Sequence, residues 1–490
     1  MMEMFLSSHY LKPDTITYDK VNTAASENYH MQHMVSLWDA AHLLAKLPEY
    51  QDKKVATMSL PELTARLDGF MKQFLRERCT KGLLVEIASP TYYKYTLSAL
   101  YNLYDFSEDA GLRELADMFF NVYFADWAIE QFDGVRGGSK HRAYGGGSSF
   151  ILFKDLGWPG FGLGSLSNHP GYSCALNTAW RPNPLVAELV LMPAEERGSY
   201  EYISRRCGHM GAGKVRPDFA GKNLLRYTYH TPGFIMGMSM VPPLTNNNPK
   251  NWAEISSQNR RNMLLFNGIK KSKIFTQQAN SKAYNAEWGV QNKGVMILQV
   301  LDKKCTSGVS NQSIFFSHTL KPFKKDSWLF VEAADAYCAI NILKGDYTVN
   351  KHMYRDREVG SYYVLDEIYS PIIFEVSEKA NYPSFEDFQA EIASNTLRQS
   401  ANSLTYASKA YQNELTLYTD YSKNPEVNGT TVDFNPEYGY QSPYLNGTFG
   451  ESIVMISNGD KELVYDFEMD KAKAAIAEIP KQLALAKKTK

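Results

Sequence analysis

The chain has 490 residues, which is more than one hydrophobic core usually serves, so two domains are expected. Its residues are 44% apolar and 21% charged, a composition that is typical of a globular protein and excludes a disordered one. The formal net charge of −1 excludes a global attraction to nucleic acid or to an anionic membrane. We therefore expect neither partner, and an anionic ligand must be held by a local basic cluster.

The first part of the chain has the apolar spacing of amphipathic helices. Helices are predicted at residues 27–44, 61–79, 92–104 and 109–131. Ser26 is a suitable N-cap for the first of them, and Pro61 fits the first turn of the second. Because short polar breaks separate these long helices, antiparallel helical hairpins are expected. No apolar run approaches the length that a membrane span needs.

The character of the chain then changes twice. Residues 132–250 are rich in Gly, Pro and Asn and show no clear periodicity, which favours long functional loops. A further helix is predicted at residues 252–266. After about residue 275, short β-branched and aromatic runs return regularly, as in an antiparallel β-sandwich. The boundary between the two parts is predicted between residues 266 and 285, with one helical insertion at 384–394.

The cysteines and histidines give no support for a metal or cofactor site. The five cysteines lie far apart and form no CxxC pair, so we expect buried packing thiols. His30 and His33 lie three residues apart, but no third ligand is evident near them. We therefore expect no metal and no cofactor.

Two motifs at predicted helix starts carry possible chemistry. The run from Glu86 to Tyr95 places Tyr92 in a first helical turn, where a side chain points toward whatever the helices surround. The run from Ser26 to His30 places Asn28 at another helix start, where its amide can donate hydrogen bonds into a cleft. Local packing of the tyrosines and simple helix capping are the competing interpretations.

Two basic stretches are candidates for binding an anion. Residues 136–144 combine Arg, Lys and His side chains with glycines, and Arg binds carboxylates in a planar fork. Residues 201–230 carry six Lys or Arg against two acids and end in adjacent Tyr and His, which are suitable proton carriers. Arg260 and its neighbours can add further donors. A solvated surface loop and a structural His are the competing interpretations.

These features together resemble the heparinase II/III-like and alginate-lyase group of polysaccharide lyases. Glu86, Ser89, Pro90 and Tyr92 are similar to that group's acid-then-tyrosine motif, and the run from Ser26 to Tyr29 is similar to its Asn-His motif. The resemblance implies an α+β multidomain protein. An N-terminal (α/α) incomplete toroid of helical hairpins would occupy residues 1–270, and a C-terminal antiparallel β-sandwich domain residues 271–490. It also implies an extracellular or periplasmic location.

The activity that this resemblance implies is β-elimination from a uronic-acid-containing polysaccharide, so the expected partner is an acidic polysaccharide or oligosaccharide. Donors hold the uronate carboxylate, and a Tyr or His carries the proton. Proton transfer is assigned to Tyr92 and His230, and the carboxylate to Asn28, His141 and Arg142. Further substrate contacts are assigned to Glu86, Tyr144, Arg136, Arg226, Tyr229 and Arg260.

Two alternatives remain open at this point. A glycoside hydrolase on a helical scaffold would need two carboxylates that flank the scissile bond, with Glu86 and either Asp126 or Asp133 as the pair. A glycan-binding protein without catalysis would use the many aromatic residues as platforms. Fold alone does not separate these functions.

Overall fold

The structure is a computed structural model of the whole chain, and its placement is described for most of it. The described residues are 27–55, 58–84, 86–89, 92–141, 156–164, 173–207, 209–210, 214–215, 223–242, 260–268, 270–278, 287–300, 311–354 and 356–468. Among them, no helix is long and apolar enough to cross a membrane.

Four long helices form the first part of the molecule, as predicted. They are α2 (Glu27–Ala45), α3 (Leu60–Thr80), α4 (Tyr93–Phe106) and α5 (Ala110–Ala128). The side chain of Ser59 accepts a hydrogen bond from the backbone N–H of Glu62 and so caps α3, and Asp109 caps α5 in the same way. Shorter helices follow: α7 (Trp158–Phe161), α8 (Ser173–Asn177), α9 (Pro184–Leu191) and α10 (Ala194–Arg197).

The longest sheet among the described residues has twelve antiparallel strands. In spatial order they are β20 (Tyr347–Tyr354), β21 (Arg357–Leu365), β16 (Gln312–Ser317), β13 (Lys273–Gln278), β12 (Met263–Phe266), β10 (Phe234–Met240), β9 (Asn223–His230), β6 (Tyr200–Cys207), β28 (Tyr438–Gln441), β29 (Leu445–Thr448), β30 (Ile453–Asn458) and β31 (Lys461–Asp466). The C-terminal strands therefore join this sheet beside β6 and not beside their neighbours in sequence.

Two further antiparallel sheets complete the β part. The six-stranded sheet consists of β14 (Glu287–Asn292), β15 (Val295–Val300), β22 (Ile372–Glu378), β19 (Ala336–Ile342), β18 (Trp328–Glu332) and β17 (Phe323–Lys325). The five-stranded sheet consists of β23 (Thr396–Gln399), β24 (Ser403–Ser408), β25 (Asn413–Tyr418), β26 (Glu426–Val427) and β27 (Thr430–Thr431). Helix α12 (Phe385–Ser394) precedes β23 and confirms the predicted insertion.

Four short two-stranded ribbons lie between these elements. They are β1 (Lys54–Val55) with β2 (Met58–Ser59), β3 (Gln131–Phe132) with β4 (Val135–Arg136), β5 (Lys140–His141) with β11 (Arg260–Arg261), and β7 (His209–Met210) with β8 (Lys214–Val215). The β5–β11 ribbon holds His141, which the sequence analysis assigned to the substrate carboxylate.

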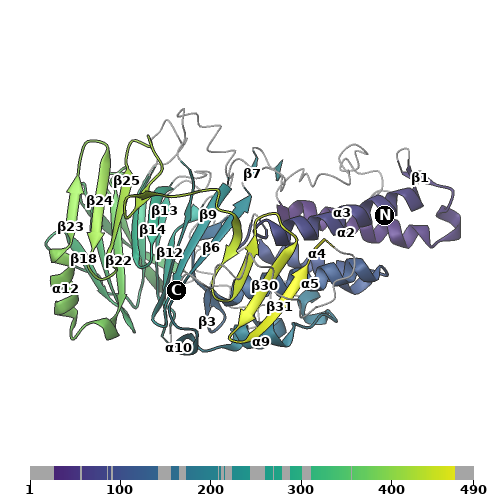
Figure 1. The fold of residues 1–490 in the computed structure, drawn as a ribbon, viewed down its shortest axis with the longest axis horizontal. Helices are drawn as coiled ribbons and strands as arrows, with labels where there is room; N and C mark the ends of the chain where they lie inside the picture. The colour runs from purple at the N-terminus through teal and green to yellow at the C-terminus, as the bar shows by residue number, and fades with distance from the viewer. Residues whose placement is uncertain are drawn as a thin grey trace.

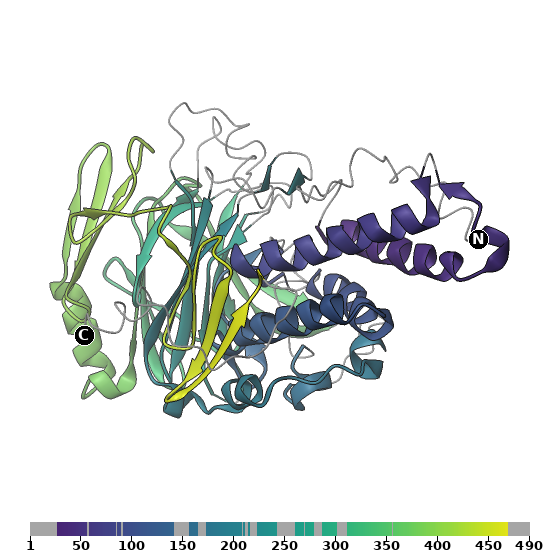
Figure 2. The same ribbon diagram turned by 45° about the vertical axis from the view of Figure 1, so that its right-hand side comes forward.

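Strands of the long sheet contribute to three hydrophobic clusters among the described residues. At one end, Val454 and Ile456 of β30 pack in one core with helical residues such as Phe74 and Phe120. In the middle of the sheet, β10 and β12 share a second core with the six-stranded and five-stranded sheets, and they form a third, smaller cluster with β3 and β4. Figures 1 and 2 show the long helices α2 to α5 at one end of the molecule and β23, β24 and α12 at the other, with the long sheet between them. This arrangement places the helix–sheet junction in the middle of the molecule.

The fold is thus α+β with antiparallel sheets, but two predictions about its course need correction. Residues 260–266 are strands and not the end of a helix, because Met263–Phe266 pairs with β10 and β13 as a fully buried strand. A buried apolar run of this length fits a strand or a helix equally well by periodicity. The first long strand, β6, begins at Tyr200, well before the boundary predicted at 266–285. The toroid and the division into two domains stay predictions.

Glu375 should make the stability of the β part depend on pH. This carboxyl is fully buried on β22 and accepts hydrogen bonds from Tyr406 and Ser408 of the five-stranded sheet at 2.5 and 2.6 Å. Burial raises its pKa from 4.5 to about 7. A raised acid pKa means that the folded state binds the proton more tightly, so stability should fall by roughly 3 kcal/mol as the pH rises from about 4.5 to 7.

Thermal or urea unfolding of Glu375→Gln across this pH range checks the expectation. The variant should lose most of this pH dependence, whereas Glu367→Gln, at an exposed position, should keep the wild-type profile. An unchanged profile in Glu375→Gln would assign the pH dependence to other groups.

Candidate active site

Helices α2 and α4 pack against each other, and both begin beside residues 86–89. Asn28, in the first turn of α2, donates from Nδ2 to Oε2 of Glu86 at 2.6 Å, and both side chains are buried. Tyr92 is the N-cap residue of α4, and its backbone N–H donates to Ser89 Oγ at 3.1 Å. The two sequence motifs, 58 residues apart, therefore meet at the starts of two neighbouring helices.

A buried ion pair stabilises the junction between residues 86–89 and the start of α2. Glu27 pairs with Arg78 of α3 at 2.8 Å and also accepts the backbone N–H of Glu86 at 3.0 Å. Burial and the nearby Arg78 guanidinium lower the pKa of His30 to about 4, so this imidazole is neutral at pH 7. Ala88 has a φ of 60°, an uncommon value for a residue that is not glycine, just before the start of α4. Such backbone strain is often found at functional sites.

The positive, N-terminal ends of the α2 and α4 dipoles lie together at this junction. The first backbone N–H groups of a helix have no intrahelical acceptor, and they favour negative charge. Because Glu27 is neutralised by Arg78, the junction is suited to an anionic group on a ligand. The Glu86 carboxylate accepts the hydrogen bond from the Asn28 amide and so orients Asn28.

A second cluster, the arginine network, is buried between α5 and the long sheet. It consists of Asp126, Glu130, Arg136, Arg206 and Arg226. Arg226 and Arg136 contact Glu130 at 2.5 and 2.7 Å, Arg206 contacts Asp126 at 2.9 Å, and Arg136 also pairs with Asp126. Burial alone would raise the pKa of Asp126, but the guanidinium groups outweigh burial and hold it well below its usual range.

The arginine network reaches His141 through two serines. Arg226 Nε donates to Ser139 Oγ at 3.2 Å, and Ser139 Oγ lies 2.7 Å from Ser239 Oγ. His141 Nε2 lies 2.8 Å from the same Ser239 hydroxyl. At the other end, Arg206 donates to the carbonyl of Gly82, in the turn that leads toward Glu86. The network therefore connects the β5 strand with the segment between α3 and α4.

The structure gives Arg136 and Arg226 partners inside the protein, where the sequence analysis expected them to contact substrate. Both side chains have 0% exposure, and acids of α5 and of the following turn neutralise them. The same geometry bears on the hydrolase alternative. Asp126 also has 0% exposure and is engaged by two arginines, so it cannot flank a glycosidic bond in this arrangement.

Tyr229 and His230 are the last two residues of strand β9, which also carries Arg226. The His230 ring is buried and stacks on Tyr200, with ring centroids 4.8 Å apart, and its Nδ1 lies 3.1 Å from the Gly198 carbonyl. Burial and the charge of Arg197 lower the pKa of His230 to about 3. Tyr229 is half-buried, and burial and Glu201 raise its pKa to about 12.

Arg142 and Tyr144 lie outside the described residues. The backbone of Arg260 pairs with His141 in the β5–β11 ribbon. The structure thus brings together Asn28, Glu86 and Tyr92, and separately His141 with Arg226 and Arg136. Sequence reasoning missed Glu27, Arg78 and Ser239, although an acid directly before Asn28 was a possible signal for the first.

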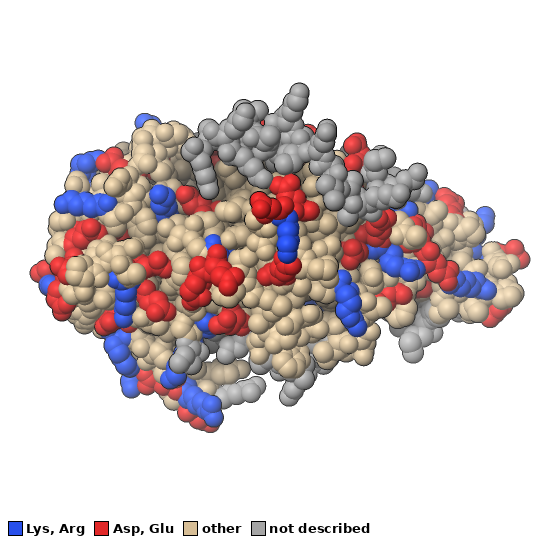
Figure 3. All heavy atoms as spheres, turned by 60° about the horizontal axis from the view of Figure 1, so that its bottom comes forward, with Lys and Arg blue, Asp and Glu red and all other residues tan. Residues whose placement is uncertain are grey.

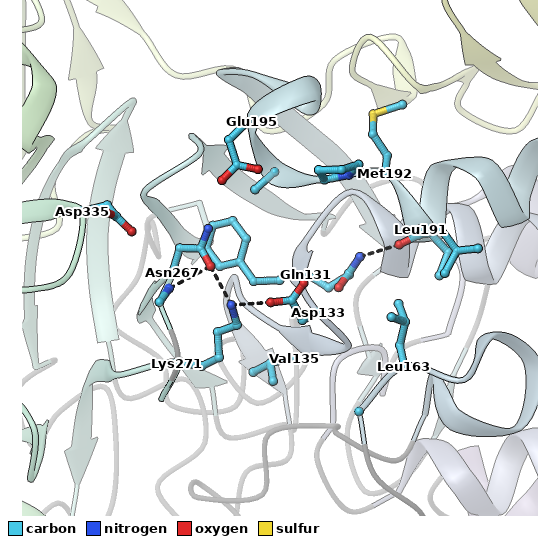
Figure 4. A pocket seen from close by; sticks show the side chains of 16 residues that line it. Gln131, Asp133, Val135, Leu163, Leu191, Met192, Glu195, Asn267, Lys271 and Asp335 are labelled. Carbon is cyan, nitrogen blue, oxygen red and sulfur yellow. Dashed lines mark hydrogen bonds and ion pairs between the residues drawn. The ribbon is translucent and has the colours of Figure 1, made fainter.

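A cavity of about 660 Å³ lies elsewhere, on the side of the junction that holds β3 and α10. Figure 4 shows its polar residues Asp335, Asn267 and Lys271 on one side and the apolar Leu163 and Leu191 on the other. Its lysine is already paired with a carboxylate, at 2.6 Å from Asp133. None of the described residues assigned to the lyase site lines it, although Asp133 of the hydrolase alternative does.

The charge around this cavity is unsuited to an acidic polymer. Its lining carries three carboxylates, Asp133, Glu195 and Asp335, against one lysine. Figure 3, which brings this side of the molecule forward, shows acidic side chains among the basic ones and several acids near the middle. The described residues of this face form no broad basic surface that could bind a polyanion.

Comparison with protein families and with curated proteins finds no match to the chain. Among solved structures, the chain is similar to a Streptomyces coelicolor A3 chondroitin AC lyase in complex with chondroitin sulphate. The TM-score is 0.36 at 11% sequence identity, over 88% of this chain and 69% of the other. A tyrosine-to-alanine variant of that lyase gives a TM-score of 0.38 at 10% identity, over 94% and 71% of the two chains. Because this similarity is distant, the function proposed below rests on the residues of this chain.

Proposed function

We propose that the chain is a polysaccharide lyase that cleaves a uronic-acid-containing polysaccharide by β-elimination. The observation that carries the proposal is the hydrogen bond between Asn28 and Glu86, which joins the two motifs at adjacent helix starts. It places an amide donor, two helix N-termini and Tyr92 at one place. β-Elimination requires donors that stabilise the uronate carboxylate and a group that transfers the neighbouring proton, and these residues can supply both.

The role of Asn28 follows from its geometry. One N–H of its side-chain amide donates to Glu86, which fixes the direction of the amide group. The second N–H of an Asn amide is a further donor. We assign it to the substrate carboxylate, on which negative charge grows as the proton beside it is removed. Such preorganised donors are usually the largest single contribution to this kind of catalysis.

Tyr92 is the proton carrier in this proposal. Its phenolate takes the proton next to the carboxylate, the bond to the glycosidic oxygen breaks, and a double bond forms in the uronate ring. The resulting phenol can return its proton to the departing oxygen, so protons balance over the cycle. His230 is better suited to a positioning role, because a buried imidazole with a pKa of about 3 is a weak base. His141 and Arg142 remain our candidates for additional donors to the carboxylate.

A panel of acidic and neutral polysaccharides followed by ultraviolet absorbance tests the proposal. A lyase leaves a conjugated double bond in its product and so raises the absorbance, whereas a hydrolase releases fragments without it. A glycan-binding protein releases no fragments. We propose an extracellular or periplasmic location, where such polymers are found.

Asn28→Ala is expected to lower kcat/KM about tenfold to a hundredfold. The substitution removes the donor to the carboxylate and leaves the Glu86 carboxylate without its amide partner. Initial rates on the polysaccharide that the panel identifies provide the measurement. Ser36→Ala, at an exposed position of the same helix, is the matched control and should keep the wild-type rate. Equal rates for the two variants would remove Asn28 from the site.

A further inference from the structure

The loop of residues 137–139 lies directly on strand β10. Gly237 of β10 allows this close approach, because a Cβ at that position would lie 2.5 Å from the Gly138 Cα. Side chains two residues apart on a strand point to the same face of the sheet, so Ser239 faces the loop on the side that Gly237 leaves open. The missing side chain at Gly237 therefore lets the hydroxyl oxygens of Ser139 and Ser239 lie 2.7 Å from each other.

Both serines are also held by contacts other than their hydroxyl groups. Arg226 Nη2 donates to the Ser139 carbonyl at 3.2 Å, and Lys140 Nζ donates to the carbonyls of the two loop glycines. On the other side, the backbone N–H of Ser239 donates to Asn262 Oδ1 at 3.3 Å. The positions of the two hydroxyls are therefore fixed by the surrounding structure.

The hydrogen bonds from Arg226 to His141 run in one direction. Arg226 Nε can only donate, and it lies 3.2 Å from Ser139 Oγ. The Ser139 hydroxyl accepts at this end, so its own proton points to Ser239 Oγ. Ser239 Oγ accepts that proton and has one of its own to donate, and His141 Nε2 lies 2.8 Å away. All four side chains are buried, so bulk water does not compete for these protons.

We propose that Arg226, acting through Ser139 and Ser239, holds the neutral His141 imidazole in the tautomer that carries its proton on Nδ1. A neutral imidazole has one N–H and one acceptor nitrogen, and the hydrogen bond made by one nitrogen decides where the proton lies. Ser139 and Ser239 are positioning residues, because they act on a substrate only through His141. That the Nδ1–H then donates to a uronate carboxylate rests on the function proposed above.

The tautomer decides what the second ring nitrogen of His141 does. With the proton on Nδ1, this nitrogen is a hydrogen-bond donor, which suits a carboxylate. With the proton on Nε2, a lone pair would stand at Nδ1 and would repel a carboxylate oxygen. Arg226 therefore has a second role beside its ion pair with Glu130, because it sets the direction of the whole chain.

Nuclear magnetic resonance of the whole chain with isotopically labelled histidine tests the tautomer, because protonated and unprotonated ring nitrogens resonate far apart. Spectra are recorded well above the ordinary histidine pKa of about 6.5, and His141→Gln assigns the signals. The wild type should carry the His141 proton on Nδ1. Ser239→Ala and Ser139→Ala should each move it to Nε2 in a large part of the molecules, whereas Ser139→Thr, which keeps the hydroxyl, should retain the wild-type spectrum. Ser204→Ala is the matched control, because this buried serine pairs in register with Arg226 but takes no part in the chain.

A wild-type spectrum with the His141 proton on Nε2 would overturn the inference without any variant, as would a proton that stays on Nδ1 in both alanine variants. Activity separates the inference from the proposed function. A misdirected donor should cost less than a removed one, so Ser139→Ala should lower kcat/KM about tenfold and Ser139→Thr should restore it. A protein with the proton on Nδ1 that forms no unsaturated product would sink the lyase proposal and leave the tautomer standing. A proton moved to Nε2 at an unchanged kcat/KM would overturn the positioning role of the two serines.

Discussion

Tyr92→Phe should remove nearly all turnover while the protein stays folded. The substitution deletes one hydroxyl at the N-cap of α4 and leaves the ring and its packing in place. A group that transfers a proton in the transition state contributes about a hundred- to ten-thousand-fold in rate, so a loss of that size is expected in kcat. Initial rates from the absorbance of the unsaturated product, with binding of intact polymer measured separately, provide the test.

Tyr95→Phe is the control for Tyr92→Phe. Tyr95 is half-buried on the same helix, with its ring 6.5 Å from that of Tyr92, and loses the same single atom. Its rate should stay near that of the wild type. If Tyr92→Phe keeps more than about a tenth of the wild-type rate, the proton carrier lies elsewhere, with Tyr144 and Tyr229 the next candidates. If Tyr92, Tyr144 and Tyr229 all prove dispensable while Glu86 proves essential, the hydrolase alternative is favoured.

The long helices were predictable because their signals are local. The first predicted helix, residues 27–44, matches α2 at Glu27–Ala45, since its apolar side chains recur at helical spacing and form one buried face. Helix α12 was predictable in the same way, with Ser384 as its N-cap. For such elements the side chains within one or two turns decide the structure.

The return of the C-terminal strands to the helical core could not be predicted. Tyr440 donates from its hydroxyl to the Cys79 carbonyl at 2.7 Å, across 361 residues of sequence. The β-branched and aromatic runs of β30 and β31 predict strands, but nothing in these runs specifies which sheet edge or which core the strands join. The strand order, with β28 beside β6, is therefore a property of the whole fold.

The same limit applies to the candidate site. The motifs around Asn28 and Glu86 were visible because their residue types and spacing are distinctive, and the structure shows that they meet. The basic residues at positions 136 and 226 looked like an anion site because their counterions are not beside them in sequence. Asp126 and Glu130 supply that charge from the end of α5 and the turn after it. A local excess of positive charge is thus weak evidence for a ligand until its tertiary partners are known.

Asp126→Asn should destabilise the folded protein by about 3–5 kcal/mol. Asp126 pairs with Arg136 and Arg206 with no exposure to solvent, so the substitution leaves the buried Arg206 without its carboxylate and Arg136 with Glu130 alone. Urea unfolding followed by tryptophan fluorescence measures the change. Asp133→Asn is the matched control, because Asp133 pairs with Lys271 while its side chain is 81% exposed, and such a surface pair contributes about 0–1 kcal/mol.

Acid should narrow the difference between the wild type and Asp126→Asn. The pKa of Asp126 is depressed in the folded state, so its contribution to stability is fully present above the unfolded-state pKa of about 4. Below that pH the unfolded chain takes up the proton first, and the contribution is lost as the pH falls toward the folded-state pKa. The two unfolding midpoints should therefore converge below about pH 4, whereas Asp133→Asn should follow the wild type throughout. A cost under 1 kcal/mol at neutral pH, or one that does not shrink in acid, would mean that Arg136 and Arg206 are neutralised by other groups.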